Sequence, residues 1–194
     1  MNIKQQKQIK GFLTEEFGAD NGKALFDKQE LKLNELIKST KNKSDNQMKT
    51  LIQTILPRIA LYKVMLKDEF SEEDAYQHMR KYMIDKVATK KHSSTAKMEL
   101  VPGFYSIYSN IFLKIMRTTD LQESVQSRGK NYFDVTIKKC LWHTACKEND
   151  CEKLCCLFCD VDDVTYGGLK NLSFSRTKTL GYGGDCCDFH FYKK

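Results

Sequence analysis

All eight cysteines of this 194-residue chain lie in its last third, where thiols could bind a metal, form disulfides or act as nucleophiles. They are Cys140, Cys146, Cys151, Cys155, Cys156, Cys159, Cys186 and Cys187. The N-terminal sequence MNIKQQKQIKG lacks the apolar segment of a secretory signal, so we expect a cytoplasmic protein. Because thiols stay reduced in the cytoplasm, metal binding or catalysis is favoured over a disulfide framework. Any single cysteine could also be a small buried apolar residue.

The spacing of the cysteines gives limited support for a metal site. Cys156 and Cys159 form one C-x2-C pair, which is typical of zinc ligands. The second pair, Cys186 and Cys187, is adjacent, and adjacent side chains of a strand point to opposite faces. We therefore disfavour a four-cysteine zinc site and predict no cofactor, although zinc or iron remains possible. Three further potential ligands are Cys140, His143 and Cys146.

Arg176 is the most informative single residue. It follows Leu172 and Phe174 on the face of a predicted strand that should be buried. A buried guanidinium needs an acidic partner or an anionic ligand. Arg176 is thus either part of a structural ion pair or the anchor of a substrate carboxylate. The aspartates that could pair with it are Asp160, Asp163 and Asp188.

Asp160 and Asp163 are the candidate acid–base residues. They are three positions apart, so on a helix they occupy neighbouring positions of one face. Two close carboxylates repel each other, which can raise the pKa of one and make it a general acid or base. A solvated helix end is the alternative. His143 and His190 could also act as bases, but a lone histidine on a strand is more often structural.

The elements of the first half are predicted to be helices. Apolar residues recur at three- and four-residue steps from Leu51 to Leu66, with a kink or break near Leu56 because of Pro57. Ser71 and Asp74 resemble a capping box that opens a helix through about Val87. Further helices are predicted at 23–38 and 104–116, and polar loops at 38–47 and 90–97.

The second half is predicted to contain strands. Phe133, Val135 and Ile137 alternate with polar residues, which is typical of a strand with one buried face. Two more strands are predicted at 172–176 and 187–191, a helix at 148–159, and a glycine-rich hairpin turn at 181–184. This order predicts an α+β fold in which N-terminal helices precede a small antiparallel sheet with one inserted helix. We expect one domain, 1–194, with a helical N-terminal extension over 1–46.

Composition restricts the partners. The net charge is +7, but the charges are well mixed, so a nucleic-acid partner is not expected. No stretch approaches the 18 apolar residues of a membrane span, so no membrane partner is expected either. A small-molecule ligand remains, and the aromatic segment 104–112 could be either core or the face of a homodimer.

Several segments of the chain resemble the L-2-amino-thiazoline-4-carboxylic acid hydrolase family. They are ILPRIALYKVMLKDEFSEEDAY (55–76), PGFYSIY (102–108) and the C-terminal pattern C-x5-C-x4-C…FCDVDD…FSRTKTL…G…CCDF. The resemblance covers 50–194, and its C-terminal block is the more specific part. His190 stands where the family more often has arginine. The matching residues are Cys140, Cys146, Cys151, Phe158, Cys159, Asp160, Asp163, Phe174, Arg176, Thr179, Leu180, Gly183, Cys187, Asp188 and Phe189.

This resemblance implies a bacterial enzyme of cysteine metabolism that opens the thiazoline ring to N-carbamoyl-cysteine. Ring opening requires attack on C2, the amidine-like carbon, while sulfur leaves. Carboxylates must hold the amidine and take a proton from water. The resemblance makes Asp160, Asp163 and Asp188 the candidates for these roles.

For the substrate, Arg176 is the expected carboxylate anchor, and Cys140 and Cys187 are expected to line the pocket. Cys159 could instead attack C2, but this needs a lowered thiol pKa, which its neighbour Asp160 would raise. We therefore favour the water route. The same C-terminal pattern is also similar to 4-vinyl reductase-type ligand-binding domains, so a non-catalytic sensor of a small molecule or metal is the alternative.

Overall fold

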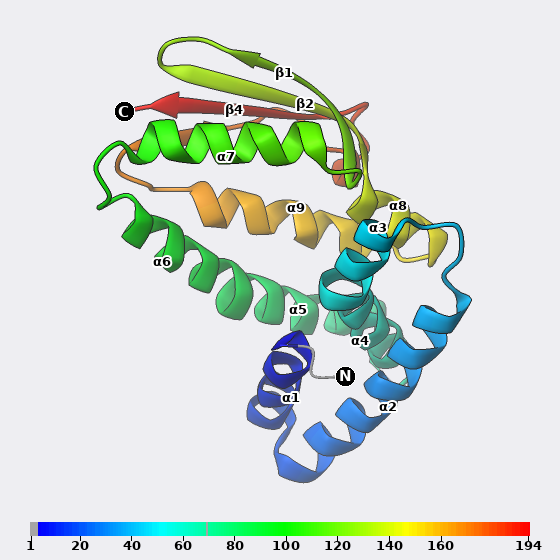
Figure 1. The fold of residues 1–194 in the computed structure, drawn as a ribbon. Helices are drawn as coiled ribbons and strands as arrows, with labels where there is room; N and C mark the ends of the chain where they lie inside the picture. Colours follow the sequence, from blue (N-terminus) through cyan, green and yellow to red (C-terminus); the bar gives the residue numbers. More distant parts are fainter. Residues whose placement is uncertain (1–3, 69) are drawn as a thin grey trace. The chain divides into compact units, whose positions relative to one another are not determined.

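The computed structural model describes residues 4–68 and 70–194. Its contacts divide the chain into two compact units, which are described separately below (Figure 1). The first unit comprises residues 1–82 and 145–154, and the second comprises residues 83–144 and 155–194. Helices build the first unit, and the second combines helices with an antiparallel sheet, so the predicted α+β class is confirmed.

The first unit is built of helices joined by short loops in its described residues. Its elements are α1 (Lys4–Phe17), α2 (Ala19–Ser39), α3 (Asp45–Thr50), the π-helical turn η1 (Leu51–Ile55), α4 (Leu56–Lys67) and α5 (Glu72–Arg80). The predicted helix over 23–38 lies within α2. Ser71 caps α5 as predicted, since its side chain accepts a hydrogen bond from the backbone N–H of Asp74 at 3.1 Å.

Two glycines make the turn between α1 and α2. Gly18 adopts a positive φ of 80°, a conformation in which a Cβ would be strained. At Gly22 a Cβ would lie only 2.5 Å from the carbonyl oxygen of Leu13, so this glycine lets the two helices pack closely. The buried side chains of α2 include Leu25 and Leu33, and they belong to the apolar core of this unit.

Pro57 accounts for the irregular helix that precedes it. Proline has no N–H, so the carbonyl of Gln53 loses the donor that an α-helix would provide. The chain forms the π-helical turn Leu51–Ile55 here, and the predicted break near Leu56 is confirmed. When the Gln5 amide is oriented with its oxygen toward Arg58, its nitrogen donates to the Gln53 carbonyl at 2.9 Å. A buried side chain thus satisfies the carbonyl that Pro57 leaves unpaired.

The predicted polar loop at 90–97 is wrong. The helix that starts with α5 continues through the π-helical segment η2 (Lys81–Ala88) into α6 (Thr89–Met98). Its serine and threonine hydroxyls donate to carbonyls one turn back, as Ser94 does to Lys90 at 3.0 Å and Thr95 to Lys91 at 3.0 Å. These bonds let hydroxyl residues remain in a helix that their propensity disfavours.

The second unit contains a four-stranded antiparallel sheet of order β1-β2-β4-β3. The strands are β1 (Gln122–Arg128), β2 (Tyr132–Cys140), β3 (Leu172–Ser175) and β4 (Cys187–Lys193). The three predicted strands are confirmed, although Arg176 lies just beyond β3. The sequence analysis missed β1, because QESVQSR contains a single apolar residue. Two helices, α8 (Leu141–Glu148) and α9 (Glu152–Tyr166), are inserted between β2 and β3 instead of one.

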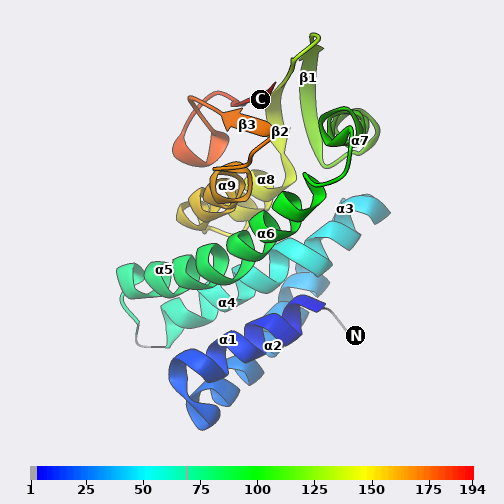
Figure 2. The same ribbon diagram turned by 90° about the vertical axis from the view of Figure 1, so that its left-hand side faces the viewer.

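One face of the sheet carries the aromatic core of this unit. Phe133 pairs with Phe191 across β2 and β4, and their rings stack with centroids 4.6 Å apart. Helix α7 (Phe104–Thr118) packs on this face through Phe112, and α9 packs on it through Tyr166. Figures 1 and 2 show both helices on the same side of the sheet. This packing fixes the inner face of α9 against β4.

Glu99 anchors the start of β3. The side chain is buried, and its two oxygens accept the backbone N–H groups of Lys170, Asn171 and Leu172 at 2.8, 2.6 and 3.2 Å. Three donors from successive residues compensate the burial of the carboxylate. The end of α6 therefore holds the strand that leads into Arg176.

Candidate active site on helix α9

The inner face of α9 brings four polar side chains together. Cys155, Cys159, Asp162 and Tyr166 are spaced by four, three and four residues, so they share one face of the helix. The thiols of Cys155 and Cys187, the first residue of β4, interact with the sulfur of Cys159 and lower its pKa. The predicted pocket residue Cys187 thus lies beside Cys159.

The sulfur of Cys159 lies where its charged form is stabilised. Hydrogen bonds from the thiols of Cys155 and Cys187 and from the Thr179 hydroxyl, together with the positive charge of Arg176, hold the pKa of Cys159 well below its usual range, although burial opposes them. The pKa of Cys187 is raised, because its proton is held by the hydrogen bond to Cys159. The two shifts favour a charge on Cys159 over one on Cys187, whereas the sequence predicted a raised pKa for Cys159.

Cys140 stays a neutral thiol at the end of β2. Its pKa is raised to about 11, mainly by burial and to a smaller extent by the charges of Cys159 and Asp162 nearby. Cys159 and Asp162 therefore lie near Cys140, and its role in lining a substrate pocket stays a prediction.

Asp162 is a candidate acid–base residue that the sequence analysis missed. The residue is half-buried, but its carboxyl group is densely surrounded by protein, and this burial raises its pKa to about 7. The positive charges of Lys91 and Arg176 oppose the shift, and the negative charges of Cys159 and Asp163 add to it. Attention to the helical period from Cys155 and Cys159 would have identified Asp162, whereas pairing Asp160 with Asp163 passed over it.

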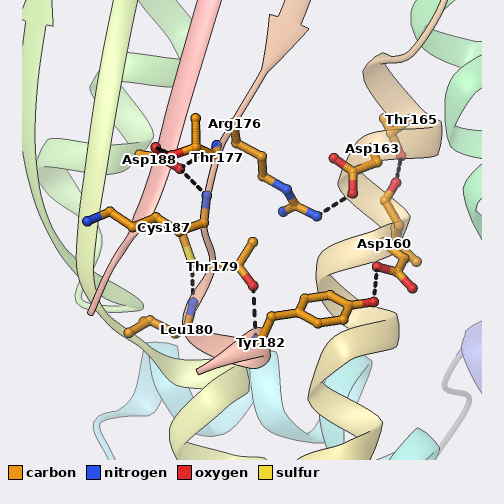
Figure 3. A network of polar contacts seen from close by, with 12 residues as sticks. Asp160, Asp163, Thr165, Arg176, Thr177, Thr179, Leu180, Tyr182, Cys187 and Asp188 are labelled. Atoms are coloured by element: carbon orange, nitrogen blue, oxygen red, sulfur yellow. Dashed lines mark hydrogen bonds and ion pairs between the residues drawn. The ribbon is translucent and has the colours of Figure 1, made fainter. Parts of the chain in front are cut away.

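Arg176 combines a structural ion pair with an unused donor. Its side chain is only 7% exposed, and Nη2 donates to a carboxylate oxygen of Asp163 (Figure 3). The guanidinium lies over the rings of Phe174 and Phe189, 6.0 and 5.9 Å from their centroids. Its Nη1 is buried and has no hydrogen-bond partner. A buried donor left unpaired is costly, and an anionic ligand would satisfy it.

The other two predicted carboxylates have protein partners (Figure 3). Asp160 accepts a hydrogen bond from the Tyr182 hydroxyl at 2.8 Å, while burial raises its pKa. Asp188 accepts the backbone N–H groups of Thr177 and Lys178 at 3.0 and 2.8 Å. Although burial opposes them, these bonds hold the pKa of Asp188 below its usual value. Asp188 thus fixes the turn that follows Arg176.

The glycine-rich turn covers the sulfur of Cys159. It contains the short 3₁₀ helix Leu180–Tyr182 between β3 and β4, and the backbone N–H of Leu180 donates to the sulfur of Cys187 at 3.3 Å. A Cβ on Gly181 would lie 2.8 Å from the Cys159 sulfur. The glycine therefore lets the backbone approach the thiolate closely.

One cysteine considered as a metal ligand, Cys146, is part of the first unit, whereas the α9 cluster is part of the second. Cys146 and Cys151 belong to the first unit, where the Cys151 thiol donates to the carbonyl of Cys146 at 3.4 Å. Across residues 4–68 and 70–194, no group of three or more histidine, cysteine, aspartate or glutamate side chains is arranged to hold a metal ion.

Comparisons with known proteins give one match. The model of a family described as L-2-amino-thiazoline-4-carboxylic acid hydrolase matches residues 46–191, a range that contains every residue of the α9 cluster. No curated protein and no solved structure matches the chain. No helix in the described part of the chain is long and apolar enough to span a membrane.

Proposed function

Because the chain belongs to the L-2-amino-thiazoline-4-carboxylic acid hydrolase family, we propose that it hydrolyses 2-amino-thiazoline-4-carboxylate. Water adds at C2 and the bond from C2 to the ring sulfur breaks. The product, N-carbamoyl-cysteine, carries a free thiol and a urea group. The substrate therefore presents a carboxylate, a basic amidine and a sulfur leaving group to the protein.

The unused donor of Arg176 is the observation that carries this proposal. Nη1 is buried and unpaired, while Nη2 is held by Asp163, so the guanidinium is fixed with one buried donor that a carboxylate would satisfy. Cys159 and Asp162 both interact electrostatically with Arg176, which supports a reaction at these two side chains next to the proposed anchor. A substrate carboxylate on Nη1 would thus put the small ring near both side chains.

The contacts of the predicted carboxylates support different roles for them. We propose that Asp163 is a positioning residue, because its carboxylate already holds Arg176. Asp188 is not part of the proposed chemistry, since it is engaged by the turn at residues 177 and 178. Asp160, bonded to Tyr182, remains a candidate for contact with the amidine.

The test is turnover of 2-amino-thiazoline-4-carboxylate by protein purified under reducing, oxygen-free conditions, with metal analysis of the same sample. We expect Arg176→Gln to raise KM by about 10- to 100-fold, the cost of one charge-assisted hydrogen bond. Arg80→Gln, at an exposed position of α5, is the matched control and should leave KM unchanged.

Two results would overturn the proposal. Absence of turnover by the wild-type protein would contradict the proposed reaction, and binding without turnover would support the sensor instead. An unchanged KM in Arg176→Gln would remove Arg176 as the anchor while leaving the reaction in place.

A further inference from the structure

We propose that Cys159 attacks C2 of the substrate to form a covalent intermediate, and that Asp162 transfers the protons of both half-reactions. This inference rests on the proposed function and specifies its chemistry. It replaces the water route favoured by the sequence with a thiolate route.

The surroundings of Cys159 are those of a nucleophile rather than of a packing residue. Its sulfur lies on the inner face of α9, where a Cβ on Gly181 would approach it to 2.8 Å. Two thiols and the hydroxyl of the buried Thr179 interact with the sulfur and lower its pKa. Donors of this kind stabilise a thiolate, and the thiolate is the reactive form of cysteine. Arg176 adds a positive charge near the same sulfur and, through Nη1, a place for the substrate's carboxylate.

Asp162 follows Cys159 by three residues on the same face of α9. The groups that interact with its carboxyl come from several elements: Lys91 of α6, Tyr108 of α7, Cys140 of β2, Cys159, Asp163 and Tyr166 of α9, and Arg176 after β3. Only Lys91 and Arg176 of this set are cations. In this enclosure the carboxyl can keep a proton near neutral pH and still release it to a stronger base.

In the first half-reaction the Cys159 thiolate forms a bond to C2 of the protonated amidine. The bond from C2 to the ring sulfur then breaks, and its electron pair stays on the departing sulfur. Asp162 gives its proton to that sulfur. The result is an isothiouronium group on Cys159, with the substrate's own thiol now free and the Asp162 carboxylate charged.

In the second half-reaction Asp162 takes a proton from water, and the water oxygen bonds to C2. The bond from C2 to the Cys159 sulfur breaks and restores the thiolate. The urea product leaves after its oxygen has lost a proton to solvent. Both side chains return to their starting states, and one water molecule has been consumed.

The neighbouring carboxylates are less suited to this proton transfer. Asp163 is held by Arg176 and Asp160 by Tyr182, so each already serves a protein partner. Each also lies one residue after a member of the inner face of α9, Asp160 after Cys159 and Asp163 after Asp162, so neither shares that face. Asp162 alone among these three aspartates combines that face with an enclosed carboxyl group.

The first experiment is rapid acid quenching of the wild-type protein with 2-amino-thiazoline-4-carboxylate, followed by mass spectrometry. We expect a mass increase equal to that of the substrate, located on the peptide that contains Cys159. Cys159→Ala should abolish both the adduct and turnover. Cys151→Ala, which removes a thiol of the first unit, is the matched control and should keep both.

The second experiment is the pH profile of kcat/KM. In the wild-type protein the rate should fall as the pH rises above about 7, because Asp162 then loses the proton that the first half-reaction needs. Asp162→Asn should lower the rate by about 10²- to 10⁴-fold and remove this limb of the profile. Asp185→Asn, at an exposed site paired with Lys178, should change neither.

These results separate the two proposals. A wild-type protein without turnover contradicts the proposed function. Turnover that persists in Cys159→Ala, or an Asp162→Asn variant that keeps both the rate and the alkaline limb, overturns the covalent route alone. Loss of rate in Asp162→Asn with the limb unchanged would make Asp162 structural and would also overturn its assigned role.

Discussion

Burial of the Asp162 carboxyl group lowers the free energy of unfolding when this group is charged. Its pKa is raised to about 7 by burial, so the folded protein binds this proton more tightly than the unfolded chain does. As the pH rises from about 4 to about 7, the unfolded chain loses the proton first, and stability falls with each unit of pH. Above the pKa of the folded state this loss of stability reaches its full size, because the folded protein then holds a charged carboxylate in a buried position.

Asp162→Asn should therefore stabilise the protein at alkaline pH. We expect the free energy of unfolding to exceed that of the wild-type protein by roughly 2–4 kcal/mol at pH 8, with an advantage that shrinks toward pH 4. Urea denaturation across this pH range measures the effect. Asp185→Asn, on the surface, supplies the baseline. A constant difference at all pH values would show that Asp162 is not the group that titrates.

At this scale the sequence predicted roles for Arg176, Cys159 and Cys187 but could not predict which groups surround each side chain. The hydrogen bonds to the Cys159 sulfur come from α9, β4 and the glycine-rich turn, which are separated along the chain. No local pattern encodes that convergence. Asp162 was not predicted for a different reason. The three-residue spacing of Asp160 and Asp163 was taken as the signal, and the helical period that joins Asp162 to Cys155 and Cys159 was not used.

Among the elements, β3 depends on a contact from far away in the sequence. This strand has only four residues, and the buried Glu99 holds its entry through three backbone N–H groups. Arg176 is the first residue after the end of this strand. The position of Arg176, the proposed carboxylate anchor, thus depends on α6 as well as on the sheet.

Glu99→Ala should destabilise the protein by roughly 2–4 kcal/mol, because it leaves three backbone donors without their acceptor. Chemical denaturation with intrinsic fluorescence would report the change. Glu30→Ala, at an exposed position of α2, should stay within about 0.5 kcal/mol of the wild-type protein. Equal effects of the two substitutions would refute the anchoring role.

The elements also show where pattern reasoning succeeds. Alternation identified β2 and β4 because their inner faces are apolar and their outer faces polar, whereas β1 shows too little alternation to be recognised. The error at 90–97 has the opposite cause. Those residues are polar and rich in serine and threonine, but the helix arriving from α5 continues through them.

For the whole molecule, the region outside the family match is part of the folded core. The match begins at residue 46, yet α1 and α2 supply buried apolar side chains to the first unit. They include Ile9, Phe12, Leu13, Leu25, Phe26, Leu33 and Leu36. The predicted extension over 1–46 is helical in its described residues, and its role is packing.

Two leucines of α2 test this role. Leu33 is 4% exposed and Leu31 is 68% exposed. Leu33→Ala should lower the free energy of unfolding by about 2–5 kcal/mol, and Leu31→Ala by less than about 0.5 kcal/mol. Cooperative unfolding in urea measures both. Similar small losses would mean that α2 contributes little to the core.

The division of the chain has a consequence for its synthesis. The first unit consists of residues 145–154 as well as residues 1–82. The chain crosses between the two units three times, within η2, α8 and α9. On the ribosome the N-terminal helices emerge early, but the unit to which they belong lacks a segment until residue 154 has left the exit tunnel. During translation the early helices therefore remain in an incomplete unit until a part of the chain that is made much later has emerged.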